Sequence, residues 1–217
     1  MRRCSSGLVE AMHDEAGLSL VELVFAMLIL SIVVVTFGTT LVAVQRAAVK
    51  EEALSQTLNQ ARLALEQLDR QIRSGNVLYD PALEGGSQPT CTGCIPYYTV
   101  RVYTQANADT ASSYYCTLWK IDSSGVLSTR QWPPDDPSSA TGWYVVATGI
   151  LSRSLGERAF TLDTDPLKGS RTLNMALAVN TDSVGSPTRI VRVQAAITGR
   201  NTSYGFPTGV CTPTPSG

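Results

Sequence analysis

The chain has 217 residues, with 17 Lys and Arg against 18 Asp and Glu and a formal net charge of −1. This length leaves room for one ordinary domain with an appendage. Scattered basic residues in a near-neutral chain create no positive field, so nucleic-acid binding is disfavoured. The single histidine is His13, near the N-terminus. A Ser-His-Asp, Cys-His or histidine-zinc site is therefore excluded from the residues that follow, and we expect neither an enzyme nor a cofactor.

The N-terminal region combines a polar tail with a long apolar segment. Residues 1 to 17 are polar and begin with Arg2 and Arg3, whereas Glu22 is the only charged residue between positions 18 and 44. About 20 apolar residues span a bilayer as a helix, so we predict a membrane segment over residues 18 to 44. A secretory signal peptide fits less well, because its apolar region would start earlier and run for only about 7 to 15 residues. The arginines indicate a cytoplasmic tail and a C-terminal domain outside the membrane.

The helical pattern continues beyond residue 44 in a different form. Apolar residues now recur at spacings of three, four and seven, which predicts an amphipathic second half of the same helix over residues 45 to 75. This stripe consists of Ala47, Leu54, Leu58, Ala61, Leu65, Leu68 and Ile72. Gly75 marks the end, since glycine commonly follows the last helical turn. We expect one helix from about Leu18 to Arg73.

The remaining residues, 76 to 217, are predicted to form a β-rich globular domain. All prolines of the chain lie at or beyond Pro81. Patterns rich in β-branched, aromatic or alternating apolar residues predict strands at 97–104, 113–121, 126–132, 143–150, around Phe160, 173–179 and 191–197. A sheet with one apolar face needs a partner, which the striped half of the helix provides. The predicted fold class is α+β, with a long N-terminal helix packed on an antiparallel β-sheet.

Five cysteines are present, and four of them follow the apolar segment. If Cys4 is lost with the N-terminal tail, Cys91, Cys94, Cys116 and Cys211 remain. An even number in an exported domain predicts two disulfides, with three possible connectivities. A zinc site is the alternative, because Cys91-x-x-Cys94 has ligand spacing. A second close pair is missing, so we favour disulfides and expect no metal.

The junction between the polar tail and the apolar segment carries a recognisable motif. Gly17-Leu18-Ser19-Leu20-Val21-Glu22, followed by an apolar helix, resembles the prepilin signature of type IV pilins and of type II secretion pseudopilins. The shared features are a glycine ending a polar leader, a large apolar residue after it, and a glutamate four positions further on. The resemblance implies that residues 1 to 17 are a leader and that a prepilin peptidase cuts between Gly17 and Leu18. It also implies methylation of the new amino terminus at Leu18.

Glu22 is unusual on physical grounds as well. A carboxylate in an apolar segment is costly unless it is neutralised or paired, and residues 18 to 44 contain no basic group. In the family that the motif resembles, this glutamate pairs with the terminal amine of an adjacent subunit. The resemblance therefore assigns Glu22 to subunit assembly. The alternative is a polar residue tolerated near the membrane interface and favoured by the helix dipole.

These features predict a structural subunit, a minor pilin or pseudopilin, of a type IV pilus-like or type II secretion filament. Before assembly it would lie in the cytoplasmic (inner) membrane, and its partners would be the prepilin peptidase, other pilin or pseudopilin subunits and the membrane. The layout looks most similar to W-type minor pilins and J-type pseudopilins. K-type tip subunits usually lack the glutamate that Glu22 provides. The alternative from another class is an unprocessed, single-pass membrane-anchored extracytoplasmic binding domain.

Overall fold

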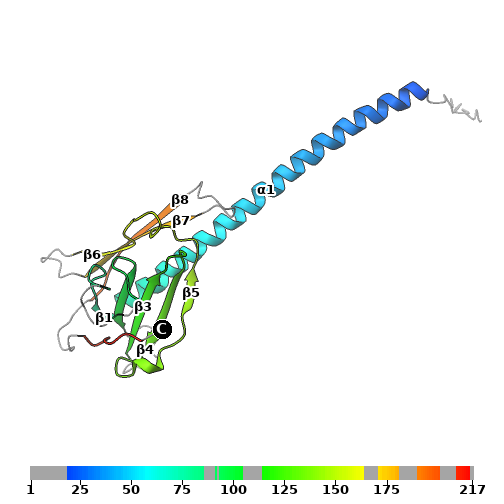
Figure 1. Ribbon diagram of the computed structural model, residues 1–217. Coiled ribbons are helices and arrows are strands. Elements are labelled where there is room, and N and C mark those ends of the chain that lie inside the picture. The colour runs from blue at the N-terminus through cyan, green and yellow to red at the C-terminus, as the bar shows by residue number, and fades with distance from the viewer. Residues whose placement is uncertain are drawn as a thin grey trace, which may run out of the picture. The chain divides into compact units, whose positions relative to one another are not determined.

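The computed structural model describes residues 19–85, 91, 93–104, 114–163, 171–180, 190–200 and 209–215. In this part of the chain one long helix, α1 (Leu20–Arg73), precedes eight strands (Figure 1). The chain divides into two compact units, Met1–Ala48 and Val49–Gly217, and α1 contributes residues to both. The strands all belong to the second unit. The predicted α+β class, a long N-terminal helix with antiparallel β-structure, is confirmed.

The strands form two antiparallel sheets in which neighbours in sequence are neighbours in space. The larger sheet contains β1 (Gly75–Leu78), β2 (Thr99–Thr104), β3 (Tyr115–Ile121), β4 (Leu127–Trp132) and β5 (Tyr144–Ala147), in that order. The smaller sheet contains β6 (Phe160–Leu162), β7 (Thr172–Asn180) and β8 (Ile190–Thr198), also in that order. Each sheet is therefore a simple meander.

Two features differ from the sequence-based expectation. We expected one sheet, but the chain leaves the larger sheet after β5, and Ile150 makes a bridge to Val179 of β7 instead. Strand β1 was not expected, because Gly75 and Asn76 in it are typical of turns. It forms because it pairs antiparallel with β2 directly after the helix ends. The short 3₁₀ helix η1 (Pro137–Ser139) lies in the loop expected between β4 and β5.

The main hydrophobic core joins the second half of α1 to both sheets. Ala61, Ala64, Leu68 and Ile72 are each 1% exposed, and their spacing of three or four places them on one helix face. Because the side chains of the two alanines are small, the strands can pack close to this helix face. The larger residues that fill the core from the sheets include Val100, Val102, Trp119, Ile121, Leu127, Phe160, Leu173, Met175, Leu177, Val179 and Ile197.

Polar contacts fix the end of α1 against this core. Gln71 is fully buried, and its Oε1 accepts a hydrogen bond of 2.7 Å from Nε1 of Trp119. Its backbone carbonyl accepts a second bond of 2.8 Å from the hydroxyl of Thr104. Beside it, a Cβ added to Gly199 would lie 2.5 Å from the carbonyl oxygen of Ile72. Since buried polar groups are costly when unpaired, these contacts set the position of the last helical turn on the sheets.

A second apolar cluster includes side chains of β2, β3 and β4 together with Cys211 from the C-terminal segment. Its buried members are Cys94, Tyr103, Cys116, Leu118, Trp132 and Cys211. The C-terminal segment, residues 209–215, is held here by hydrogen bonds between its main chain and side chains of the domain. Nη1 of Arg101 donates to the Cys211 carbonyl at 3.2 Å, and Nη2 of Arg130 donates to the Pro215 carbonyl. The Cys211 amide donates to the hydroxyl of Tyr79 at 3.2 Å.

Two leucines on α1 test how much the helix contributes to the stability of the second unit. Leu68 is 1% exposed, whereas Leu63 is 61% exposed. We expect Leu68→Ala to lower the free energy of unfolding by about 2 to 5 kcal/mol, because it leaves a cavity in the core. Leu63→Ala should change it by less than about 0.5 kcal/mol. Denaturant unfolding of the detergent-solubilised chain measures both, and equal losses would contradict the described packing.

Candidate functional site

The first half of α1 presents apolar side chains on every side. Seventeen large apolar residues between Leu20 and Val44 are exposed, with exposed fractions from 44% at Val42 to 79% at Leu20. In the described part of the chain, no protein surface buries the most apolar window of this helix. An all-round apolar helix is typical of a membrane span or of a helix surrounded by other helices. This surface is the main candidate functional site.

The few hydroxyl groups in this half are already satisfied within the helix. Ser31 Oγ donates to the Leu28 carbonyl at 2.7 Å, and Thr36 Oγ1 donates to the Val33 carbonyl at 2.9 Å. Thr39 and Thr40 make equivalent bonds one turn back, at 2.9 and 2.8 Å. Hydroxyls that bond to the preceding turn need no water, so the helix can enter a nonpolar environment without leaving them unpaired.

The length and composition of α1 suffice for one bilayer crossing. The 25 residues from Leu20 to Val44 rise about 37 Å at 1.5 Å per residue, against about 30 Å of hydrocarbon. Among the described residues α1 is the one helix that is long and apolar enough to cross a membrane. On an insertion scale the seventeen apolar side chains together favour the membrane by roughly 5 to 10 kcal/mol. One charged residue costs about 3 kcal/mol even at the bilayer centre, so Glu22 does not prevent insertion.

Glu22 lies in the first turn of α1 and is exposed. It forms no ion pair within the described residues. Its position at the helix start is electrostatically favourable, because the unpaired amides there carry partial positive charge. Gly17 and Leu18, the residues predicted for cleavage and methylation, lie outside the described residues. The processing site therefore stays a prediction, and so does the assembly role of Glu22.

The four cysteines after the apolar segment form two disulfides, as the sequence predicted. Cys91 pairs with Cys94, and Cys116 of β3 pairs with Cys211 in the C-terminal segment. This selects one of the three connectivities that the sequence left open. Cys116 and Cys211 are both 0% exposed, whereas Cys91 is partly exposed. The Cys116–Cys211 bond thus fixes the C-terminal segment to the larger sheet, and the Cys91–Cys94 bond closes a short loop.

A buried ion pair lies next to the Cys91–Cys94 loop. Glu84 and Arg101 are 2% and 5% exposed, and Nε of Arg101 is 3.1 Å from Oε1 of Glu84. The guanidinium also lies 4.0 Å from the centre of the Tyr79 ring. Burial raises the pKa of Glu84, and attraction to Arg101 opposes part of that rise. Sequence reasoning missed this pair, because 17 positions separate its members and neither belongs to a motif.

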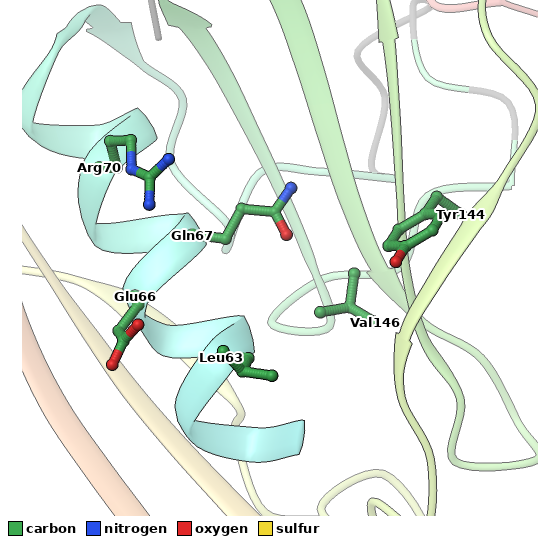
Figure 2. A pocket seen from close by; sticks show the side chains of 6 residues that line it. All are labelled: Leu63, Glu66, Gln67, Arg70, Tyr144 and Val146. Atoms are coloured by element: carbon green, nitrogen blue, oxygen red, sulfur yellow. The ribbon is translucent and has the colours of Figure 1, made fainter. Parts of the chain in front are cut away.

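A groove of about 340 Å³ lies between α1 and the edge strand β5. Figure 2 shows Gln67 extending from the helix toward Val146 and Tyr144 on the strand. Leu63, Glu66, Gln67, Arg70, Tyr144 and Val146 line it. The acid and the base among these six belong to the same helix face, and the other four offer no nucleophile with an adjacent base. The lining therefore gives no catalytic arrangement.

The two disulfides should contribute unequally to stability. The Cys116–Cys211 bond joins residues 95 positions apart, and the Cys91–Cys94 bond joins residues 3 positions apart. From loop entropy we expect Cys116→Ala with Cys211→Ala to lower the free energy of unfolding by about 4 to 5 kcal/mol. The matched pair Cys91→Ala with Cys94→Ala should lower it by about 2 kcal/mol. Denaturant unfolding without reductant compares them, and a larger loss from the second pair would contradict this ranking.

Comparison with known proteins adds no further identification. No protein-family model, no curated protein and no solved structure matches this chain significantly. The function must therefore be inferred from the residues and their arrangement. The apolar half of α1, with Glu22 in its first turn, is the feature that constrains it most.

Proposed function

We propose that this chain is a structural subunit of a type IV pilus-like or type II secretion filament, either a minor pilin or a pseudopilin. A prepilin peptidase removes residues 1 to 17 and methylates Leu18. The processed subunit is held in the cytoplasmic membrane by the apolar half of its helix, with the β-rich domain outside. It then joins other subunits through that same half. The finer assignment to a W-type minor pilin or a J-type pseudopilin rests on the layout alone.

The observation that carries this proposal is the contrast within one continuous helix. Side chains on one face of its second half are buried at 1% exposure, while large apolar side chains of the first half are 44% or more exposed. A soluble domain gains nothing from such a surface, and a simple anchor would not need a helix that continues directly into the domain core. A subunit that moves from lipid into a bundle of like helices needs both properties.

Glu22 supports assembly rather than anchoring alone. Within α1 the nearest basic residue after it is Arg46, which lies about 36 Å further along the helix axis. Glu22 therefore has no partner within its own helix once it enters an apolar environment. Cleavage after Gly17 would create an α-amine on Leu18, and the amine of a neighbouring subunit would neutralise the carboxylate. Such a pair would align adjacent helices, since an unpaired charge among apolar helices is strongly disfavoured.

Substitution of Glu22 separates assembly from processing. In cells that make the other filament subunits, we expect Glu22→Ala to be cleaved and membrane-bound, yet depleted roughly ten-fold or more from purified filaments. The loss of a charge-assisted hydrogen bond accounts for that factor. Glu52→Ala is the matched control, because Glu52 is an exposed glutamate of α1 beyond the apolar segment. Quantitative immunoblotting gives, for each variant, the ratio of the subunit in the filament fraction to the subunit in the membrane fraction.

The same measurement has two outcomes that contradict the proposal. Normal incorporation of Glu22→Ala would show that the carboxylate does not pair during assembly. An uncleaved chain that never enters filaments, in the wild type as well as in the variants, would favour the unprocessed membrane-anchored binding domain.

A further inference from the structure

Three side chains that can ligate a metal converge beside β1 and β2. Glu84, Cys91 and Cys94 each place one ligand atom within 4.8 Å of the others. Glu84 is 2% exposed and Cys94 is 8% exposed. Oε1 of Glu84 accepts a hydrogen bond from Arg101, whereas Oε2 is buried and has no hydrogen-bond partner among the described residues. A buried carboxylate oxygen without a partner is costly, and a bound cation at this position would satisfy it.

The donor types of this cluster suit a tetrahedral zinc ion. Zinc binds thiolate sulfur at about 2.3 Å and carboxylate oxygen at about 2.0 to 2.2 Å, so tetrahedral ligand atoms lie about 3.5 to 3.8 Å apart. The ligand atoms of Glu84 and the two cysteines all lie within 4.8 Å of one another, and the two sulfurs, which are bonded here, reach the zinc spacing only after they separate. The Cα atoms of Cys91 and Cys94 are 5.4 Å apart, and their C-x-x-C spacing is common in zinc sites. The sulfurs are available as ligands only when they are not bonded to each other.

The charges around the cluster also balance. Two thiolates and one carboxylate carry −3, and a divalent cation leaves −1. Arg101, whose Nε lies 3.1 Å from Oε1 of Glu84, supplies the remaining positive charge. Arg101 is held in place independently by the Cys211 carbonyl and the Tyr79 ring. A buried site of zero net charge avoids the desolvation penalty of an uncompensated ion, and the hydrogen bond to Oε1 orients the ligating carboxylate.

We propose that Glu84, Cys91 and Cys94 bind a divalent cation of the zinc class in the reduced chain, with water in the fourth position. Binding releases the two thiol protons. When the Cys91–Cys94 bond forms, two electrons pass from the two thiolates to an oxidant of the disulfide class, which takes up two protons from the solvent and becomes two thiols. The cation leaves with its charge unchanged. The site is thus filled before oxidation and empty after it. This inference does not depend on the proposed role in a filament.

Cobalt and zinc binding by the full-length, detergent-solubilised chain tests the site. After mild reduction with a phosphine, Co²⁺ should produce thiolate-to-cobalt charge-transfer absorption that Zn²⁺ abolishes by displacement. The oxidised chain should show neither effect. Zn²⁺ should also protect Cys91 and Cys94 of the reduced wild type from iodoacetamide, as read by mass spectrometry. Unlabelled Cys116 and Cys211, which are 0% exposed, show in the same spectra that the mild reduction has left the Cys116–Cys211 bond intact.

Variants separate a built site from binding by two thiols alone. Glu84→Gln should weaken zinc affinity at least ten-fold, whereas Glu157→Gln should not change it. Glu157 is the matched control, because it also pairs with an arginine, Arg192, but lies in an exposed ion pair outside the cluster. The proposal is overturned if the reduced wild type gains neither absorption nor protection. It is also overturned if Glu84→Gln binds zinc as tightly as the wild type. The protection measurement needs no variant to fold.

Discussion

Seventeen exposed apolar side chains along the first half of α1 impose the constraint on which the other features depend. Water is a poor solvent for such a surface, so a bilayer or other protein helices must cover it. The hydroxyls of this half bond within the helix, and its only charge is in the first turn. The whole segment can therefore exchange lipid for a helix bundle with only Glu22 left to neutralise.

The second half of the same helix is instead buried on one face by the sheets of its own domain. Its small residues Ala61 and Ala64 allow the strands to pack close to the helix. Gln71 fixes the last helical turn, because it accepts hydrogen bonds from Trp119 and Thr104. The strand β1 follows the helix directly and pairs with β2, so the chain enters the larger sheet without a long connection. The Cys116–Cys211 bond and the contacts of Arg101 and Arg130 then hold the C-terminal segment against that sheet. The β-rich domain is thus closed around the end of the helix.

Sequence patterns predicted the features that depend on local periodicity. The helix and its end at Arg73 follow from an apolar run, a stripe with spacings of three or four, and Gly75. Seven of the strands follow from enrichment in β-branched and aromatic residues or from alternation, and the even cysteine count predicted two disulfides. Features that depend on pairing between distant residues were not predictable. The separation into two sheets, the strand β1 and the pair Glu84–Arg101 arise from contacts that no single segment encodes. In the candidate site, the apolar surface and the location of Glu22 at the helix start were predictable, whereas the carboxylate beside Cys91 and Cys94 was not.

The central proposal is that a chain processed to begin at Leu18 leaves the membrane to join a filament. The most direct test is the intact mass of the chain isolated from its own membranes, because it reads both the cleavage site and the modification. We expect a mass that corresponds to a chain starting at Leu18 and carrying one methyl group. A mass that corresponds to a chain starting at Met1 would contradict the account and leave a membrane-anchored domain in its place.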